Sequence, residues 1–244
     1  GGGVWDPDCA LLDVEALHHG LLRAAGRHGF KLYCSAPVEG LVRRDGLWRA
    51  DTPKGVFQAP VVVNAAGAWG DHIAMLARVT PLGLMAMRRT VVTFPVPVGG
   101  ISPEWPLVLD IDGEWYFKTE RGRILASPAD ETPMPPCDVQ PDELDIAITM
   151  AHIERVTGWK VSRLQATWAG LRIFAPDRAP VIGFDTDAEG FFWCVGQGGV
   201  GIQTAPAAAK LVEAAITGTP LPETMRALGI TPTRYAPARL RQAA

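Results

Sequence analysis

Near its carboxyl end the chain places four glycines within six positions, GQGGVG at residues 196–201. The apolar run before them, Phe191–Val195, predicts a buried strand, and the pattern at residues 202–217 predicts a helix that two nearby prolines bring to an end. A glycine loop between a strand and a helix is typical of a ligand cradle, because backbone N–H groups can approach the ligand and the helix N-terminus attracts anions. A tight strand-to-helix turn without a ligand is the alternative.

The loop is not a simple dinucleotide fingerprint. That motif requires a second strand that ends in Asp or Glu about 20 residues further on. Here the helix leads into TGTPLP at residues 217–222, and no strand pattern follows. We therefore predict close backbone contact with an anionic group or an electron-rich ring edge, without a complete βαβ unit.

A second apolar run, residues 61–65, ends in the small side chains of Ala66 and Gly67, with Trp69 shortly after them. Its nearly continuous apolar character predicts a strand that is buried on both faces, as in a parallel sheet. Small residues at the end of such a strand let a ligand or another backbone lie close. The alternative is that these small residues serve close packing and contact no ligand.

Composition restricts the class of function. Hydrophobic residues make up 48% of the 244 residues and charged residues 20%, which is typical of a globular chain with a sizeable core. Lys and Arg number 23 against 26 Asp and Glu, without a basic run, so nucleic-acid binding is not indicated. No window approaches the roughly 20 apolar residues of a membrane span. The four widely spaced cysteines predict buried or partly buried free thiols in a reducing compartment, and hence a cytoplasmic location.

Periodicity and turn residues divide the chain into regions with two different patterns of secondary structure. An α/β layer is expected up to about residue 80 and again from about residue 165, and an antiparallel sheet with one helix is expected between them. Asp13 predicts a helix N-cap, Asp45-Gly46 a hairpin turn, and Pro141 the first position of the middle helix. A loop is expected at 130–139, and a solvated tail from Arg234. Helices are predicted at 13–28, near 71, from 141 and at 202–217, and strands at 31–35, 38–43, 47–51, 61–65, 90–96, 107–111, 114–118, 123–127, 166–173, 181–184 and 191–195.

Three side chains are candidates for chemistry. Arg172 lies within an apolar strand pattern, where an unpaired guanidinium is costly to bury. It therefore requires a carboxylate partner, which is either a ligand or a structural salt bridge to Asp177 or Asp185. For Arg89, at the start of a strand, a ligand carboxylate and a structural salt bridge are again the two alternatives. Tyr116 is a candidate for presenting a phenol to a pocket, with core packing as the usual alternative. The five histidines show no spacing that indicates a catalytic or metal-binding group, and no metal site is expected.

Six stretches together resemble the D-amino-acid oxidase-type FAD oxidoreductases and, within that family, the D-arginine dehydrogenases. They are DVEALHHG at 13–20, VVNAAGAWGD at 62–71, PLGLMAMRR at 81–89, DVQPDELDIA at 138–147, TWAGLR at 167–172 and EGFFWCVGQGGVGIQT at 189–204. The resemblance implies an α/β (α+β) fold with two domains. Residues 1–80 and 165–244 would belong to a Rossmann-like FAD-binding domain, and residues 81–164 to a substrate domain with an antiparallel sheet.

The resemblance also implies an activity and roles for particular residues. The activity is FAD-dependent oxidation of a D-amino acid to an imino acid, which hydrolyses to a 2-oxo acid and ammonia. Arg172 and Arg89 would hold the substrate carboxylate, Tyr116 would contact the substrate, and the carbonyl oxygen of Gly170 would receive its amine. The glycine loop would lie beside the flavin pyrimidine ring and stabilise the negative charge that builds up there. Gln203 and Val200 are further candidates for substrate contact. The residues expected to bind FAD are Ala66, Gly67, Trp69, Gly198, Gly199, Gly201, Ile202, Gln203 and Thr204.

The sequence also departs from the family pattern. Family members begin with a βαβ unit that binds the FAD pyrophosphate, and that unit is absent from these 244 residues. We expect a preceding segment or a partner chain to complete the FAD site, and the strand at 61–65 to expose its edge and apolar faces without it. The segment that would select the substrate side chain is absent too, and Val200 stands where an aromatic residue is expected. Glycine, sarcosine and a proline derivative are therefore alternative substrates. An accessory subunit and a plain binding module for small carboxylates are the alternatives from other classes.

Overall fold

The structure is a computed structural model that describes residues 2–97, 101–102 and 105–241. It divides into two compact units, and two of the boundaries between them fall within long strands, β5 (Met85–Pro95) and β10 (Ala166–Phe174). Helices pack on sheets whose strand pairs are mostly antiparallel, which confirms the predicted mixed α/β class. Unit 1 comprises Gly1–Leu32, Arg89–Glu131 and Gln140–Gly170, and unit 2 comprises Tyr33–Arg88, Thr132–Val139 and Leu171–Ala244.

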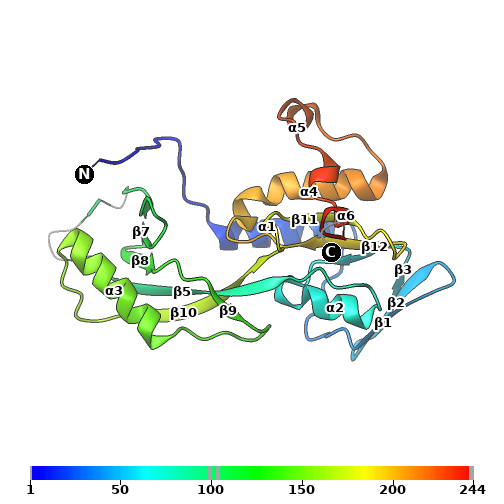
Figure 1. Ribbon diagram of the computed structural model, residues 1–244, viewed down its shortest axis with the longest axis horizontal. Coiled ribbons are helices and arrows are strands. Elements are labelled where there is room, and N and C mark those ends of the chain that lie inside the picture. The colour runs from blue at the N-terminus through cyan, green and yellow to red at the C-terminus, as the bar shows by residue number, and fades with distance from the viewer. Residues whose placement is uncertain (1, 98–100, 103–104, 242–244) are drawn as a thin grey trace. The chain divides into compact units, whose positions relative to one another are not determined.

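In unit 1 an antiparallel sheet carries helix α3 on one face (Figure 1). The register pairs Val92 of β5 with Ala126 of β8, and Ala126 with Phe117 of β7. Because side chains alternate between the two faces of a strand, these three share one face. They pack there with Ile153 of α3, which is fully buried. Besides β5 and β10, this layer contains β6 (Val108–Leu109), β7 (Tyr116–Glu120), β8 (Arg123–Ser127) and α3 (Glu143–Thr157).

Helix α1 (Val14–Arg27) begins where the sequence predicted. The Asp13 carboxylate accepts a hydrogen bond from the N–H of Ala16 at 2.9 Å, which caps the helix. Gly29 follows the helix in the left-handed region, with φ of 86°. None of the α1 residues is buried, so its apolar stripe stays uncovered by the described residues.

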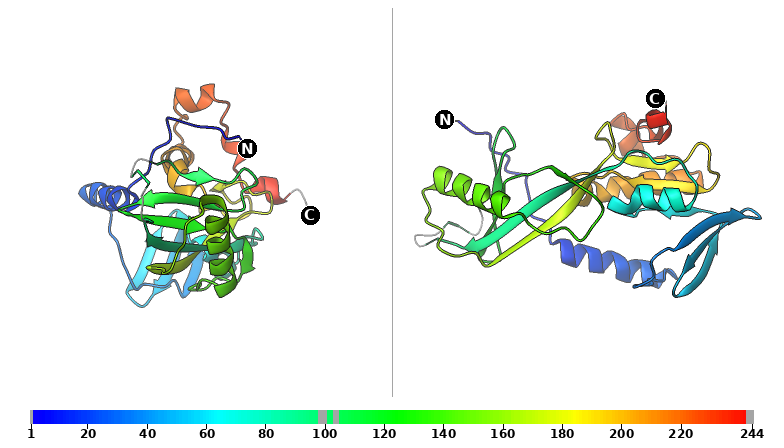
Figure 2. Two further views of the ribbon diagram at one scale, coloured as in Figure 1. Left: turned by 90° about the vertical axis from the view of Figure 1, so that its left-hand side faces the viewer. Right: turned by 60° about the horizontal axis from the view of Figure 1, so that its bottom comes forward.

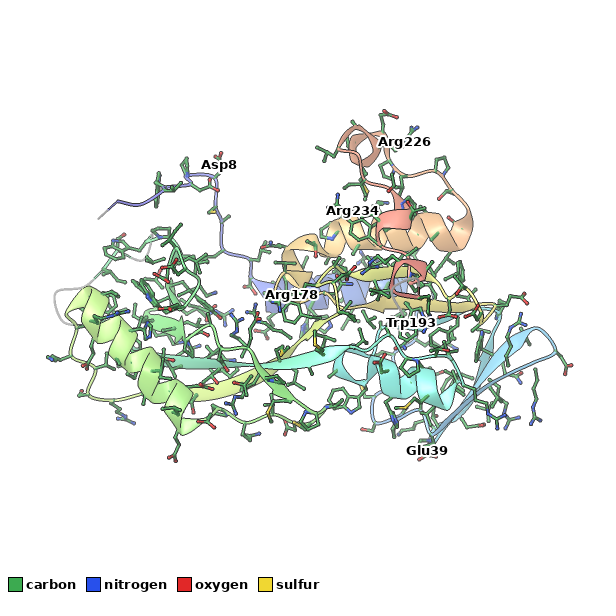
Figure 3. All side chains as sticks on the ribbon, in the orientation of Figure 1. Asp8, Glu39, Arg178, Trp193, Arg226 and Arg234 are labelled. Carbon is green, nitrogen blue, oxygen red and sulfur yellow. The ribbon has the colours of Figure 1, made fainter. Side chains whose placement is uncertain are left out.

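Unit 2 has a three-stranded sheet between two layers. The strand order is β11-β12-β4, with β11 and β12 antiparallel and β12 and β4 parallel. Phe191 and Trp193 face the layer formed by α2 and the strands β1 (Gly40–Arg44) and β2 (Leu47–Thr52), whereas Ile182 and Phe192 face α4. Trp193, labelled in Figure 3, is fully buried and donates its indole N–H to Asp185 at 2.9 Å. The sheet consists of β4 (Val62–Asn64), β11 (Val181–Phe184) and β12 (Phe191–Val195), and the helices around it are α2 (Gly70–Leu76), α4 (Gly201–Thr217), α5 (Glu223–Ala227) and α6 (Ala238–Arg241), with η1 (Gly67–Trp69) and η2 (Pro232–Arg234) as 3₁₀ turns.

The predicted hairpin at Asp45-Gly46 is confirmed as part of a three-stranded meander, drawn in blue in the right-hand view of Figure 2. Asp45 and Gly46 have φ of 50° and 79°, the left-handed values that a two-residue hairpin turn requires. The strands are β1 (Gly40–Arg44), β2 (Leu47–Thr52) and β3 (Gly55–Ala59), and β9 (Thr132–Met134) pairs separately with the first part of β5.

Several predicted elements are wrong. Residues 31–35 form no strand, because no described strand lies beside them to share backbone hydrogen bonds. The sequence reading missed β3, and it also missed β9 within the expected loop. Pro141 precedes α3 and is not its first residue, since Asp142 caps the helix by accepting the N–H of Leu144 at 2.9 Å. The strand predicted at residues 61–65 is the shorter β4. Val63 on it is exposed, which is the exposure expected for this strand where no further segment or chain covers it.

The carboxyl-terminal segment is not the solvated tail that we predicted. Arg239 pairs with Asp177 at 2.6 Å, and Arg241 pairs with Asp185 at 3.0 Å. Arg241 also donates to the carbonyl oxygens of Thr80 and Pro81, so that both arginine side chains are largely buried. These ion pairs fasten α6 to the body of unit 2.

The cysteines form neither a disulfide nor a metal site within the described residues. Cys137 and Cys194 are partly buried, as predicted, and burial raises the pKa of the Cys194 thiol. Cys9 and Cys34 are exposed, against the prediction, because the stretches around them form no helix or strand that could pack over them. Across the same described residues, no helix combines the length and apolar character that a membrane crossing needs.

Candidate functional site

Two glycine-containing segments leave the same edge of the unit 2 sheet. β4 and β12 run parallel, with Val63 beside Phe192 and Asn64 beside Trp193. The segments that follow these strands, residues 65–69 and 196–201, therefore both start at the carboxyl ends of parallel strands. This is the edge at which ligands bind in α/β sheets. The fold thus brings together two sequence features that lie far apart in the chain.

Asn64 shapes the first of these segments. It is 2% exposed, its side-chain N–H donates to the carbonyl oxygen of Gly70 at 2.8 Å, and its oxygen accepts from the N–H of Ala66 at 3.3 Å. Gly67 has φ of 56°, and a Cβ built there would meet no atom within 4 Å, so the space beside it is open. Trp69 follows with its ring exposed. Sequence reasoning missed this role of Asn64, although a polar residue inside an apolar strand was a usable signal.

The second segment, residues 196–201, packs closely against the end of β10. The N–H of Gly198 donates to the carbonyl oxygen of Ile173 at 2.8 Å. Gly196 and Gly198 have φ of 73° and 56°, which favour glycine. A Cβ at Gly198 would lie 2.6 Å from Cε1 of Phe174. Both the backbone conformation and the contact with β10 therefore require glycine here.

Arg172 lies directly against this loop. A Cβ built on Gly199 would stand 1.9 Å from Nη1 of Arg172, so a side chain at position 199 would displace the guanidinium from its present position. The structural salt bridge that we considered for Arg172 is not formed, because Asp177 pairs with Arg239 and Asp185 with Arg241. Within the described residues Arg172 makes no hydrogen bond or ion pair. A cation in this position is suited to an anionic ligand.

Helix α4 begins at the end of the same loop. Val200 occupies its N-cap position and supplies no side-chain hydrogen bond. The N–H groups of a helix's first turn lack intrahelical acceptors, and the helix dipole makes this end positive. Val200 and Ile202 are exposed, as is Gln203, whereas the hydroxyl of Thr204 donates back to the carbonyl oxygen of Val200 at 2.9 Å. The start of α4 therefore presents backbone donors rather than side-chain ones.

Unit 1 holds the other candidate residues. Tyr116 pairs with Ser127 across β7 and β8. The next pair along these strands, Phe117 with Ala126, faces α3, so Tyr116 points to the opposite face of the sheet. Arg89 lies three residues before Val92 and shares that opposite face. Its Nε donates to the carbonyl oxygen of Asp130 at 2.8 Å. Gly170 is exposed on β10, with no atom within 4 Å of an added Cβ.

A pair of carboxyl groups adjoins Arg89, and sequence reasoning missed it. The Asp130 carboxylate accepts the N–H of Thr90 at 2.7 Å and its hydroxyl at 3.2 Å, and Asp145 lies 3.3 Å from the same hydroxyl. Burial raises the pKa of Asp130, and the nearby Asp145 raises it further. The only sequence signal was the acidic stretch that we expected to be a loop.

Unit 2 is an α/β arrangement with a parallel strand pair, two segments that leave its carboxyl edge and a helix without a side-chain cap. The groups that this edge offers to a ligand are mostly backbone groups. Residues 1–215 match the family described as "FAD dependent oxidoreductase", and the chain belongs to this family. The family resemblance stated from the sequence is thereby confirmed. The narrower resemblance to D-arginine dehydrogenases stays a prediction.

Three similar proteins illustrate the match. Mitochondrial dimethylglycine dehydrogenase of Rattus norvegicus is 31% identical over 128 residues, which cover 52% of this chain and 15% of that protein. Mitochondrial sarcosine dehydrogenase of Homo sapiens is 27% identical over 209 residues, which cover 78% of this chain and 22% of that protein. The crystal structure of L-proline dehydrogenase from P. horikoshii matches the fold with a TM-score of 0.76 at 24% identity. The match covers 93% of this chain and 59% of that protein. The chain thus spans less than two thirds of each relative's length.

FAD is the cofactor of this family, as the sequence led us to expect. The edge of the unit 2 sheet fits such a group in three respects. The space beside Gly67 is open, Gly198 and Gly199 leave no room for side chains of their own, and α4 offers uncapped N–H donors. The part played by each predicted residue stays a prediction.

Proposed function

We propose that this chain is part of a flavoenzyme that oxidises the carbon–nitrogen bond of an amine bearing a carboxylate, with D-amino acids as the first candidate substrates. The observation that carries the proposal is the guanidinium of Arg172, which lies against Gly199 with no partner among the described residues. A cation beside a backbone cradle suits a small carboxylate placed next to a flat cofactor. In this proposal residues 1–80 and 165–244 serve the cofactor, and residues 81–164 serve the substrate.

The protein's own residues would orient the substrate rather than exchange protons with it. When bound, FAD would supply the hydride acceptor: the substrate would lose a hydride from its carbon and a proton from its nitrogen to water, and the imino acid would hydrolyse to a 2-oxo acid and ammonia. Arg172 holds the carboxylate through charge-assisted hydrogen bonds, which fixes the carbon that reacts. The first-turn N–H groups of α4 stabilise negative charge on the ring. The resemblance assigns Arg89, Tyr116 and Gly170 to the substrate as well.

N-methylated glycines are the second candidate class. They are supported by the similarity to proteins named dimethylglycine dehydrogenase and sarcosine dehydrogenase. Both classes carry a carboxylate beside an amine, so the role of Arg172 is the same for each.

A flavin-reduction assay separates the two classes. The full-length protein that carries this chain is mixed anaerobically with D-arginine, D-alanine, glycine, sarcosine, dimethylglycine or proline, and the flavin absorbance is followed. Bleaching by the D-amino acids supports the first class, and bleaching by the N-methylated glycines alone supports the second. A flavin-loaded protein that none of them reduces would contradict the proposal.

An Arg172→Gln variant tests the carboxylate contact. We expect its half-saturating substrate concentration to rise roughly 10- to 100-fold, since a charged hydrogen bond contributes about 1.5–3 kcal/mol. Arg234→Gln is the matched control, because this arginine lies far along the chain on η2 and has no proposed role. An unchanged half-saturating concentration in Arg172→Gln would remove Arg172 from the site.

A further inference from the structure

The turn after β8 is built to hold two acidic residues against β5. Ala129 has φ of 53°, a left-handed value that is strained for a residue with a side chain, and its N–H donates to the hydroxyl of Ser127 at 3.1 Å. The Asp130 carboxylate is then fastened to Thr90 by two hydrogen bonds. Because Thr90 follows Arg89 directly, this fastening places the turn beside the Arg89 guanidinium.

Two adjacent residues of the turn bind the guanidinium itself. Its Nε donates to the carbonyl oxygen of Asp130 at 2.8 Å, and its Nη2 lies 3.4 Å from Oε1 of Glu131. The Arg89 side chain is 11% exposed, whereas that of Glu131 is 36% exposed. The backbone contact is short and enclosed. The carboxylate contact is longer and partly open to solvent, so it is the weaker of the two.

We propose that Glu131 is a specificity-determining residue, whose carboxylate competes with the substrate carboxylate for Arg89. This inference rests on the proposed role of Arg89 as a substrate-binding arginine. A buried guanidinium is costly to leave without an anion, and Glu131 is one of the anions beside it. An incoming carboxylate must displace Glu131 or lie beside it, and both alternatives lower the affinity for anions.

The competition favours one chemical class of ligand. A plain carboxylate such as acetate carries net negative charge and is repelled by Glu131 and by ionised Asp130. An amino carboxylate is a zwitterion, and its ammonium group offsets much of that repulsion. Glu131 therefore selects amino carboxylates against simple monocarboxylates and dicarboxylates.

The test compares Glu131→Gln with wild type in the full-length, flavin-loaded protein. Acetate affinity is measured by calorimetry and by inhibition of substrate oxidation. An ion pair as exposed as this one contributes about 0.2–1 kcal/mol, so the acetate dissociation constant should fall about 1.5- to 5-fold in Glu131→Gln. The Michaelis constant for the amino carboxylate should change less than the acetate constant does.

Glu120→Gln is the matched control. Glu120 pairs with Lys118 at 3.0 Å in the same unit and with similar exposure, so removing its charge should leave the acetate constant unchanged. An acetate constant that is unchanged or higher in Glu131→Gln would overturn the inference, as would an equal decrease in both variants.

Arg89→Gln separates the role of Arg89 in binding the carboxylate from the role of Glu131 in competing with it. If it weakens acetate binding while Glu131→Gln changes nothing, Arg89 binds the carboxylate and only the competition is overturned. If Arg89→Gln leaves acetate binding intact, the proposed role of Arg89 fails, and the inference about Glu131 fails with it. Thermal unfolding of each variant shows whether it is folded.

Discussion

Gly199 determines where the Arg172 guanidinium can lie, because a Cβ at that position would stand 1.9 Å from Nη1. We expect Gly199→Ala to displace the flexible end of Arg172 while leaving the fold intact. The loss of its contact with a substrate carboxylate should raise the Michaelis constant roughly 10- to 100-fold. Steady-state kinetics over a range of substrate concentrations measures this change.

Gly20→Ala is the control for the added methyl group. Gly20 lies inside α1, and a Cβ there would meet no atom within 4 Å. Alanine should stabilise the helix by up to about 1 kcal/mol and leave the Michaelis constant unchanged. Normal kinetics in Gly199→Ala would mean that Arg172 does not need its present position.

Asp130 should make stability fall as the pH rises. Burial and the neighbouring Asp145 raise its pKa above the ordinary value of 3.8. Between that value and the raised one, the native state holds the proton more strongly than the unfolded state does, so the free energy of unfolding decreases as the pH increases. Asp130→Asn removes this contribution and keeps an oxygen that can accept the N–H of Thr90.

The measurement is the free energy of unfolding of wild type and Asp130→Asn between about pH 4 and pH 7. We expect the variant to gain stability relative to wild type as the pH rises. A difference that stays flat, or that grows in favour of wild type, would show that the pKa of Asp130 is not raised.

The elements best predicted from sequence are those whose signal is local. Asp45-Gly46 fixes a hairpin turn by its own backbone preference, and β8, β11 and β12 follow from short apolar runs between turn residues. Residues 31–35 have strand character but no partner, and strand formation depends on a partner that is distant in sequence. The contacts of Arg241 with Asp185 and of Arg89 with Asp130 join distant parts of the chain, so no local pattern indicates them.

At the level of elements, the Arg241–Asp185 pair should hold α6 in place. Burial raises the pKa of Asp185, but hydrogen bonds from Trp193, the backbone of Asp187 and Arg241 outweigh burial, so the pKa lies below its ordinary value. Arg241→Met would leave a buried carboxylate without its cation and should lower the free energy of unfolding by about 2–4 kcal/mol. Chemical denaturation at neutral pH measures this loss.

Arg226→Met is the control, because Arg226 pairs with Glu223 on the exposed surface of α5 and should contribute at most about 1 kcal/mol. The sign of the pH dependence gives a second check. A depressed carboxyl pKa stabilises the protein above pH 3.8, and that stability is lost as the pH falls through and below this value. The difference between wild type and Arg241→Met should therefore shrink in acid, and equal losses in the two variants would contradict the assignment.

At the scale of the whole molecule, apolar side chains of α1 and β4 stay uncovered by the described residues. The exposed fractions on α1 are 45% for Val14, 38% for Leu17 and 57% for Leu21, and Val63 on β4 is 41% exposed. β4 has one strand neighbour among the described residues, so its other edge offers unpaired backbone groups. These exposures agree with the sequence expectation for the strand at 61–65.

We therefore expect residues 1–244, expressed alone, to associate at micromolar concentration, because an apolar stripe and an open strand edge both favour contact with another chain. Sedimentation velocity over a concentration series measures this association. Val63→Lys places a charge on the open strand, and Leu21→Glu places one on the helix stripe; each should reduce the associated fraction. Leu228→Lys is the control, since Leu228 is 78% exposed at the end of α5 and belongs to neither feature. A monomer at every concentration would mean that neither surface drives association.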